Sequence, residues 1–505
     1  MIDIQVKCGS GLNETCDLLV VGVFKKIKAL DEFTEKVNVA SGHVIDDMMK
    51  EEGFEGDVAE WLIFPTFGKL KAKKLAVIGL GERAAFTIDT ARKIGASIIK
   101  RAREAKAKNV WTMLHGVGVN GFTTRDVAAA FGEGVWLGSY HFHAYKEKER
   151  KEASKKEVAT LTVAIDDRGK VVQTERGFAR ARLLAEATMF ARDLVNTPSA
   201  EMTPAKMAEV AKEIAKRDKR ISLKIFDQTK MESMGMRAAL AVARGSQHSP
   251  YGIHLVFRPS SKPKRRIAIV GKAVTFDSGG LSIKPSEGMT TMKIDMAGAA
   301  AVLGLFRALP SLEVDTEVHG IFLAVENMPS GTAYRPGDVV KAKNGVTIEI
   351  LNTDAEGRVT LADALSYAAE LKPDEIVDLA TLTGACVVAL GEEISGLMAN
   401  DRKLAARLLL AASKAGEELW ELPLFQSYQE HIKSRVADIK NTGARGQAGT
   451  ISAALFLSHF VGKIPWAHLD IAGPSYAEKE TRPDVPFGGT GCGVRLLATY
   501  LEHFT

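Results

Sequence analysis

The feature that most constrains the fold is a series of apolar stretches rich in β-branched residues, separated by helical stretches, in the C-terminal two thirds of the chain. The strand candidates are residues 222–226, 266–270, 316–325, 346–351, 375–379 and 466–471, and the helix candidates between them include 298–309 and 361–371. Strands that are apolar almost throughout are buried on both faces, and intervening helices connect strands that run parallel. The pattern predicts an α/β fold with a mainly parallel central sheet flanked by helices.

The N-terminal part of the chain shows a weaker form of the same alternation. Its strand and helix candidates are residues 18–23, 75–80, 90–108 and 158–165. The mixed-charge run from Lys146 to Glu152 is typical of solvated chain, and 505 residues are more than one hydrophobic core usually serves. We therefore expect a smaller N-terminal accessory α/β domain at residues 1–170 and a catalytic domain at residues 171–505.

Composition is that of an ordinary globular protein, with 46% hydrophobic and 26% charged residues. No apolar run approaches the roughly 20 residues of a membrane-spanning helix, and the N-terminus lacks a basic stretch followed by an apolar one. The four cysteines are scattered and form no CxxC pair, which is typical of free thiols in a reducing compartment. These features predict a cytoplasmic protein that does not contact membranes.

Charged residues follow several of the predicted strands. Asp354, Glu356 and Arg358 come at alternate positions directly after the strand candidate 346–351. In an extended segment, residues two apart point to the same side, so we expect these three side chains to project together. In parallel sheets the ligand site lies beyond the carboxyl ends of the strands. The segment is therefore a candidate functional site.

Other charged residues occupy similar positions. Lys272 and Asp277 follow the second strand candidate of the catalytic domain, Lys284 comes a few residues later, and Asp295 precedes the helix candidate 298–309. Singly, the aspartates could cap a turn or a helix, and the lysines could lie on the surface. Together, four carboxylates at one edge of a sheet repel one another unless cations compensate. Four carboxylates suit two divalent metal ions, and oxygen ligands fit Mg²⁺, Mn²⁺ or Zn²⁺.

Three segments resemble the signature sequences of the leucyl aminopeptidase family, the cytosol aminopeptidases. Residues 352–359 (NTDAEGRV) carry Val359 where leucine is usual, residues 271–280 carry Ala273 in place of the usual glycine, and residues 292–300 match the next metal-binding segment. Neither departure removes a side chain that binds metal. The resemblance covers the whole catalytic domain and is weak in the N-terminal domain.

The resemblance implies which residues bind metal. Lys272, Asp277, Asp295 and Glu356 would hold a tighter metal ion, and Asp277, Asp354 and Glu356 a more exchangeable one, with Mn²⁺ or Zn²⁺ as the ions. A lysine that binds metal must be neutral, and a nearby dication would lower its pKa sufficiently. A metal-bridging water would attack the scissile bond.

The resemblance also implies a function. Lys284 would stabilise the oxyanion of the intermediate, and Arg358 would hold a bicarbonate that shuttles the proton. The substrate pocket would be lined by Met292, Thr381, Leu382 and Gly384. The chain would be an aminopeptidase that removes N-terminal residues, preferably leucine and other apolar ones, from peptides and amino-acid amides. It would assemble as a homohexamer with the catalytic domains packed inward.

Two other functions stay open. A DNA-binding architectural role would use the basic residues of the helix candidate 90–108 and its end, namely Lys93, Lys100, Arg101, Arg103, Lys106 and Lys108, although Glu104 and a net charge of +5 argue for a solvated helix face. A two-metal phosphoesterase would use the same carboxylates but has no need of a lysine ligand or an apolar pocket.

Three shorter motifs favour ordinary explanations. Gly79-Leu80-Gly81 lacks the third glycine of a dinucleotide fingerprint, so a tight turn is expected. The glycine-rich residues 443–449 lack the Gly-Lys-Ser/Thr ending of a phosphate-binding loop, which favours a flexible rim of the catalytic cavity. His141 and His143 have no third metal ligand nearby in the sequence and are expected to be surface or interface histidines.

Overall fold

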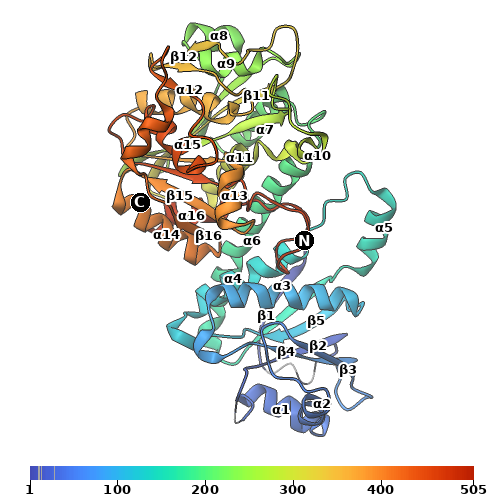
Figure 1. Cartoon of the computed structure of the whole chain (residues 1–505). Helices are drawn as coiled ribbons and strands as arrows, with labels where there is room; N and C mark the ends of the chain where they lie inside the picture. Colours follow the sequence, from blue (N-terminus) through green and yellow to red (C-terminus); the bar gives the residue numbers. More distant parts are fainter. Residues whose placement is uncertain (10–11, 13, 28) are drawn as a thin grey trace. The chain divides into compact units, whose positions relative to one another are not determined.

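The computed structural model describes residues 1–9, 12, 14–27 and 29–505. Contacts between residues divide the chain into two compact units (Figure 1). Unit 1 comprises Met1–Glu186 and Lys479–Pro486, and unit 2 comprises Ala187–Glu478 and Phe487–Thr505. The long helix α6 (Val171–Asn196) begins in unit 1 and ends in unit 2.

Unit 1 contains a six-stranded sheet in the order β1-β6-β5-β2-β4-β3. Its strands are β1 (Asp3–Cys8), β2 (Leu18–Val23), β3 (Trp61–Pro65), β4 (Lys74–Gly79), β5 (Asn109–Met113) and β6 (Thr160–Ile165). Its helices before α6 are α1 (Glu32–Ser41), α2 (Val44–Glu51), α3 (Ile88–Glu104), α4 (Thr124–Gly138) and α5 (Glu147–Lys156). Neighbouring strands run parallel, except that β3 is antiparallel to β4.

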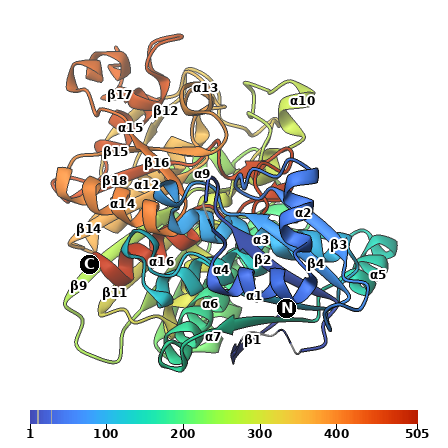
Figure 2. The ribbon, with the colours of Figure 1, turned by 90° about the horizontal axis from the view of Figure 1, so that it is seen from below.

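Helices cover both faces of this sheet. Figure 1 shows α3 on one face and α1 and α2 on the opposite face, and the view from below in Figure 2 places α1 and α2 in front of the sheet. All six residues of β2 are buried, as expected for a central strand covered on both faces. Helix α3 begins with a capping box, in which the Thr87 hydroxyl accepts the Thr90 backbone N–H and the Thr90 hydroxyl accepts that of Thr87.

Unit 2 contains a nine-stranded sheet in the order β16-β15-β18-β14-β9-β11-β8-β7, with β10 paired to β11. Its strands are β7 (Ile221–Phe226), β8 (Tyr251–Phe257), β9 (Arg265–Gly271), β10 (Ala273–Asp277), β11 (Thr316–Asn327), β14 (Glu375–Ala380), β15 (Ile394–Ala399), β16 (Glu418–Glu421) and β18 (Trp466–Asp470). The centre, from β18 through β14 and β9 to β11 and β10, is parallel. Strands β7 and β8 pair antiparallel with their neighbours, and β15 is antiparallel to β18 but parallel to β16.

The helices of unit 2 after α6 surround this sheet. They are α7 (Pro204–Arg217), α8 (Gln228–Ser233), α9 (Arg237–Ala243), α10 (Ser286–Met289), α11 (Ala297–Ala308), α12 (Glu356–Glu370), α13 (Gly384–Leu390), α14 (Arg402–Ala415), α15 (Gly449–Ser458) and α16 (Val494–His503). Short strands form two small sheets, from β12 (Val339–Lys341), β13 (Thr347–Glu349) and β17 (Ile439–Lys440), and from β19 (Tyr476–Ala477) and β20 (Gly488–Gly489).

The central strand β11 shows how both faces are covered. A Cβ on Gly320 would lie 2.4 Å from Cε2 of Phe306, so at this residue β11 faces α11. The next residue, Ile321, points to the opposite face and belongs to the core that contains Val359 and Leu365 of α12. Helices α11 and α12 therefore lie on opposite faces of the sheet.

The start of α11 contacts the sheet through backbone atoms. A Cβ on Gly298 would lie 2.1 Å from the Leu379 carbonyl oxygen, and one on Gly271 would lie 2.6 Å from the Ala299 nitrogen. Neither space admits a side chain, so the backbone of α11 packs directly on β9 and β14. This packing places Asp295, which precedes α11, at the ends of these strands.

The predicted α/β fold with a mainly parallel central sheet is confirmed, but one of the strand candidates lies outside that sheet. The strand expected at residues 346–351 is the short β13, which pairs with β12 and β17 outside the central sheet. The helix expected at residues 361–371 begins earlier, at Glu356. In the described residues, all four cysteines are free, and none of the helices has the length and apolar character needed to cross a membrane.

Candidate metal centre

Parallel strands of unit 2 end at one edge of the sheet, and polar residues stand at these ends. They are Lys272 after β9, Asp277 at the end of β10, Asn327 at the end of β11, Thr381 after β14 and Asp470 at the end of β18. Asp295 precedes α11 at the same edge, and the segment that carries Asp354 and Glu356 leads into α12. The carboxyl ends of parallel strands are where α/β proteins bind ligands.

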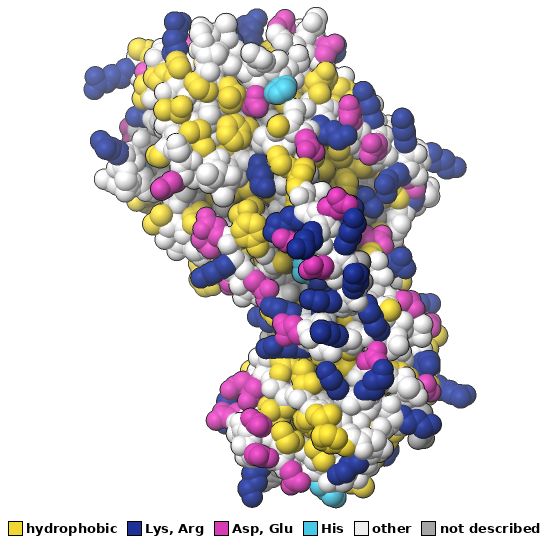
Figure 3. Space-filling model, turned by 90° about the vertical axis from the view of Figure 1, so that its right-hand side faces the viewer, with side chains coloured by type: hydrophobic (Ala, Val, Ile, Leu, Met, Phe, Trp, Pro, Cys, Tyr) yellow, Lys and Arg dark blue, Asp and Glu magenta, His cyan; other side chains and the backbone are white. Residues whose placement is uncertain are grey.

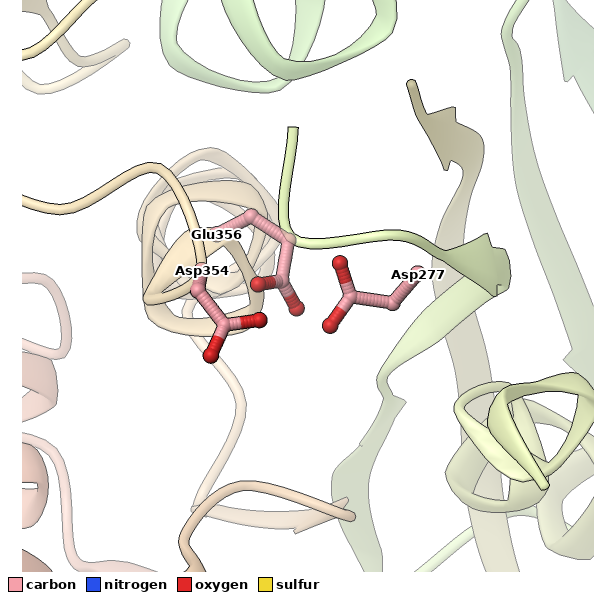
Figure 4. Close-up of side chains that lie close together, drawn as sticks. All are labelled: Asp277, Asp354 and Glu356. Atoms are coloured by element: carbon pink, nitrogen blue, oxygen red, sulfur yellow. The ribbon is translucent and has the colours of Figure 1, made fainter. Parts of the chain in front are cut away.

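Three carboxylates converge in this region. Figure 4 shows the side chains of Asp277, Asp354 and Glu356 pointing toward one another, and one oxygen of each lies within 4.8 Å of the others. Asp277 and Glu356 are buried, and Asp354 is partly exposed. Among the described residues, this is the cluster of His, Cys, Asp and Glu side chains that could hold a metal ion, and His141 and His143 are not part of it.

Lys272 joins a fourth carboxylate to this cluster. Its Nζ lies 2.7 Å from Oδ1 of Asp295 and 2.9 Å from Oε1 of Glu356, and it donates to the Thr381 carbonyl oxygen at 2.8 Å. The Thr381 hydroxyl donates to the same Asp295 oxygen at 2.7 Å. Burial lowers the pKa of Lys272, but Asp295, Glu356 and Asp277 outweigh burial and raise it, so the amine carries its proton.

Lys284 occupies the other side of the cluster. Its Nζ lies 2.9 Å from Oδ2 of Asp277 and also forms an ion pair with Asp354. Burial lowers the pKa of Lys284, whereas Asp277 and Asp354 raise it by more. Each of the two lysines thus bridges two carboxylates. Both carboxylates that pair with Lys284 belong to the cluster of three.

The charges of the centre do not balance. Two ammonium groups offset half of the negative charge on Asp277, Asp295, Asp354 and Glu356. Burial and the Asp277 charge raise the pKa of Asp295 to about 6, and they also raise that of Glu356 well above its ordinary value. Oδ2 of Asp295 and Oε2 of Glu356 are buried without a hydrogen-bond partner. Buried acceptors of this kind favour a cation, so the donor set fits divalent metal ions.

The structure corrects the expected geometry of the segment that carries Asp354, Glu356 and Arg358. Glu356 is the first residue of α12 and Arg358 follows in its first turn, so the two side chains do not alternate as in a strand. Successive helical residues are rotated by about 100°, and positions two apart point in different directions. The expectation that all three project to one side was wrong because it assumed extended backbone.

Gly357, between Glu356 and Arg358, makes room for Lys272. A Cβ on Gly357 would lie 2.4 Å from Cε and 2.5 Å from Nζ of Lys272. The missing side chain lets the lysine cross the first turn of α12 and reach both Glu356 and Asp295.

Arg358 is a buried cation beside the acidic cluster. Burial lowers the pKa of Arg358 to about 10, while Glu356 and Asp470 act to raise it. Its Nε is buried without a hydrogen-bond partner, and none of the ion pairs found among the described residues includes Arg358. A guanidinium in this condition favours a bound anion.

The four residues expected to line the substrate pocket lie in two segments. Met292 is partly exposed in a short 3₁₀ turn that leads to Asp295. Thr381 is buried in the centre through its bonds to Asp295 and Lys272, Leu382 is partly buried, and Gly384 begins α13 and is exposed.

Sequence reasoning missed Asn327, which is fully buried at the end of β11. Its Nδ2 donates to Oδ1 of Asp277 at 2.8 Å and to the Thr353 carbonyl oxygen at 3.0 Å. The Tyr334 hydroxyl donates to the same carbonyl oxygen at 2.9 Å. Asn327 therefore joins the two segments that carry the acidic cluster. Its position just beyond the strand candidate 316–325 is the signal that could have identified it.

The basic residues proposed as a nucleic-acid footprint lie on α3 and just after it in unit 1. Lys93 pairs with Asp89, Lys100 with Glu480 and Arg101 with Glu104. Figure 3 shows Asp and Glu side chains interspersed with Lys and Arg across one face of the molecule. Pairing of this kind is typical of a solvated helix face and gives little support to a phosphate-binding surface.

Comparison with known protein families defines the class of protein. The catalytic domain of the cytosol aminopeptidase family matches residues 189–498, and the N-terminal domain of the same family matches residues 20–149. These matches define the class as metal-dependent exopeptidases, and the sheet edge with its carboxylates and lysines is the candidate metal centre.

Individual relatives agree with this class. The chain is 43% identical over 501 residues to a probable cytosol aminopeptidase of Persephonella marina, with 99% of each chain covered. It is 46% identical over 452 residues to one from Aquifex aeolicus, covering 89% of this chain and 88% of the relative. The chain belongs to the cytosol aminopeptidase family, the leucyl aminopeptidases, and the resemblance seen in the sequence is confirmed.

Two solved structures have the same fold. A mutant of tomato leucine aminopeptidase superposes with a TM-score of 0.88 at 35% identity, covering 99% of this chain and 96% of that chain. The bottromycin maturation enzyme BotP in complex with Mn gives a TM-score of 0.84 at 35% identity, covering 96% of this chain and 99% of that chain. BotP, a protein with this fold, is therefore known in complex with Mn.

Proposed function

We propose that this aminopeptidase uses two divalent ions to hydrolyse the N-terminal bond of peptides and amino-acid amides, with a preference for leucine and other apolar residues. The observation that carries the proposal is the convergence of the Asp277, Asp354 and Glu356 carboxylates beside Lys272 and Asp295. Four carboxylates that converge beside two lysines suit two divalent ions, and two-metal sites are used by several classes of hydrolase.

The two ions would share two ligands, Asp277 and Glu356. Lys272, Asp277, Asp295 and Glu356 would hold the tighter ion, and Asp277, Asp354 and Glu356 the more exchangeable one. The unpartnered oxygens of Asp295 and Glu356 support this assignment. Mn²⁺ and Zn²⁺ both fit the donor set, and manganese in the BotP structure favours the first. Bound dications of this kind polarise a carbonyl group and lower the pKa of water.

Lys284 would stabilise the negative charge that develops on the substrate carbonyl oxygen. Its ammonium group is held between Asp277 and Asp354, which keep it protonated. A hydrogen bond that strengthens as the oxyanion forms lowers the barrier of acyl transfer. The role needs an ammonium that is only partly buried, and the Lys284 side chain is 18% exposed.

Arg358 would bind bicarbonate and place it beside the carboxylates of the centre. The buried guanidinium with its unpartnered Nε supports an anion at this position. A bound bicarbonate supplies a base that can accept and return a proton. Arg358 itself keeps its proton, because a pKa of about 10 lies well above neutrality.

The walls of the substrate site would come from Met292, Thr381, Leu382 and Gly384. Met292 is a flexible apolar side chain that adapts to substrate side chains of different shape. Leu382 packs against the core of unit 2 and can present an apolar surface to the first residue of the peptide. An apolar wall explains a preference for leucine over charged residues.

The proposal extends to domain organisation, assembly and location. Residues 171–505 would form the catalytic domain, since they contain every residue of the centre, and residues 1–170 would form an accessory domain. The chains would assemble as homohexamers in the cytoplasm. Light scattering of the purified protein tests the assembly, and a mass of one or two chains would contradict it.

Leucine amide hydrolysis tests the proposed function. Chelation should abolish turnover, and adding Mn²⁺ or Zn²⁺ back should restore it with two ions per chain. The phosphoesterase alternative predicts turnover of nitrophenyl phosphate by the same metal-loaded protein and none of leucine amide. Well-folded, metal-loaded protein that fails to hydrolyse leucine amide would contradict the proposal.

A further inference from the structure

Asp470 ends β18 and is fully buried. Its Oδ1 accepts backbone N–H groups from Leu382 at 3.2 Å, Thr383 at 3.4 Å and Ala472 at 3.2 Å. Its Oδ2 accepts the Thr383 hydroxyl at 2.7 Å. Three of these four donors belong to the segment 381–384, which follows the neighbouring strand β14.

The first residue of the same segment, Thr381, is hydrogen-bonded to residues of the candidate metal centre. The Thr381 hydroxyl donates to Asp295, and the Thr381 carbonyl oxygen accepts from Lys272. The segment 381–384 is therefore held by the centre at its first residue and by Asp470 at the next two. Its backbone position depends on both attachments.

Thr383 extends the network into two helices. Its hydroxyl oxygen accepts the Cys386 backbone N–H at 3.0 Å, which caps the start of α13, and lies 2.9 Å from the Thr450 hydroxyl of α15. Because the Thr383 hydroxyl donates to Asp470, the Thr450 hydroxyl donates to Thr383. The direction of these hydrogen bonds is thus fixed by the Asp470 carboxylate.

The charge of Asp470 is not used in an ion pair. No ion pair found among the described residues includes Asp470, whereas the nearby Asp378, equally buried in β14, lies 2.6 Å from Nδ1 of His468. A buried carboxylate without a cation is stable when several N–H and O–H groups donate to it. Asp470 also acts to raise the pKa of the buried Arg358, but it forms no ion pair with it among the described residues. Three of the four groups that donate to Asp470 come from the segment 381–384, so its direct contacts mainly hold that segment.

We infer that Asp470 is a positioning residue that fixes the backbone of residues 381–384 and thereby determines which N-terminal side chains the enzyme accepts. The inference rests on the proposed function, in which Thr381, Leu382 and Gly384 line the substrate site. Asp470 contacts neither the substrate nor the carboxylates of the centre in this arrangement. It acts through Leu382 and Thr383.

The test compares Asp470→Ala, Asp470→Asn and Thr383→Val in the full-length protein. The asparagine retains an oxygen for the backbone N–H groups, and the Thr383 hydroxyl can turn to accept its amide. Asp363→Ala is the matched control, because Asp363 is also fully buried and accepts backbone N–H groups, from Ala239 at 2.9 Å and Lys343 at 2.7 Å, outside the centre. The measurements are kcat and KM for leucine amide and alanine amide, metal content and Tm.

Asp470→Ala should lower kcat/KM for leucine amide about 10- to 100-fold with the metal content unchanged. The ratio of kcat/KM for leucine amide to that for alanine amide should fall about tenfold, since a displaced wall contacts the larger side chain less well. In Asp470→Asn this ratio should stay within about threefold of the wild-type value. In Thr383→Val it should fall, as in Asp470→Ala. Asp363→Ala should lower Tm without changing the ratio.

The inference would be overturned if the ratio of kcat/KM for leucine amide to that for alanine amide were unchanged in both Asp470→Ala and Thr383→Val. If Asp470→Ala does not fold, the ratio measured for Thr383→Val alone tests the inference. Loss of metal from the Asp470 variants would also overturn it, because Asp470 would then act on the centre. Wild-type protein that binds metal but hydrolyses neither amide would overturn the proposed function, and the inference with it.

Discussion

Nζ of Lys272 lies 2.9 Å from Oε1 of Glu356, which links the end of β9 to the first residue of α12. The two residues are far apart in the sequence, and each is buried. Their contact depends on Gly357, whose missing side chain leaves the path of the lysine open. The centre is therefore a junction between a strand end and a helix start, and its chemistry depends on how closely the two approach.

Gly357→Ala should damage the centre without unfolding the protein. The new Cβ would displace the flexible end of Lys272, and a misplacement of about 1 Å at a catalytic centre costs on the order of 100-fold in rate. We expect kcat/KM for leucine amide to fall by about that factor with little change in Tm. Gly331→Ala is the control, because a Cβ at Gly331 has nothing within 4 Å. Equal activity of the two variants would contradict the role of Gly357.

Asp354→Asn should remove the more exchangeable ion and most of the activity. The amide keeps the shape of the side chain but loses the charge, so we expect at least about a 100-fold loss of kcat and about one ion fewer per chain. Asp338→Asn is a suitable control, since the Asp338 side chain is 29% exposed and that of Asp354 is 33% exposed. Mass spectrometry of the bound metal and steady-state kinetics test whether Asp354 binds the more exchangeable ion. An Asp354→Asn protein with full activity and the full number of ions would refute this assignment.

Lys284→Gln should lower kcat while the metal ions stay bound. Removing one group that stabilises an oxyanion costs about 100- to 1,000-fold in kcat. Lys293→Gln serves as the control, because Lys293 donates to the Asn196 backbone oxygen at 2.8 Å rather than to a carboxylate of the centre. A loss of metal in parallel with activity would mean that Lys284 maintains the centre instead of acting on the substrate.

Metal binding should release protons. The pKa of Lys272 is raised above 10.5 by its carboxylate neighbours despite burial, whereas a lysine ligand must be neutral. Calorimetric titration of metal-free protein with Mn²⁺, in buffers of different ionisation enthalpy, should show close to one proton released per tight ion near neutral pH. Lys272→Met should abolish this release and the tight binding together. Binding enthalpies that do not depend on the buffer would contradict a lysine ligand.

The His468–Asp378 pair should make stability fall as pH rises. Burial lowers the pKa of His468, but Asp378 at 2.6 Å outweighs burial and raises it above 6.5. A raised folded-state pKa contributes stability that is complete below about pH 6.5 and is lost as pH rises through the folded-state value. Tm measured from about pH 6 to pH 9 should therefore decline more steeply for the wild type than for Asp378→Asn. Parallel curves would show that the pair does not titrate in this range.

The sequence predicts most strands of the central sheet because burial on both faces leaves a continuous apolar pattern. It also identifies Lys272, Asp277 and Asp295, since these residues follow or adjoin such strands. It gives the wrong geometry for Glu356 and Arg358, because alternate spacing describes a strand whereas Glu356 begins α12. Local pattern does not reveal where the chain changes from extended to helical backbone when both states suit the residues.

Residues that act through long-range contacts are harder to predict. Asn327 contacts Asp277 and Thr353, which lie 50 and 26 positions away in the sequence, and Asp470 contacts Leu382 across 88 positions. Each ends a strand, so its place at the active edge could be inferred, but its partners depend on the order of strands in the sheet. That order follows from the whole fold and not from neighbouring residues.

The direct contact of Gly298 with the Leu379 carbonyl oxygen sets the separation between Asp295 and the strand ends by main-chain atoms alone. A contact between main-chain atoms cannot adjust by a change of rotamer, as a contact between side chains can when neighbouring residues change. The distance between Asp295 and the strand ends therefore does not depend on which side chains α11 carries at this contact.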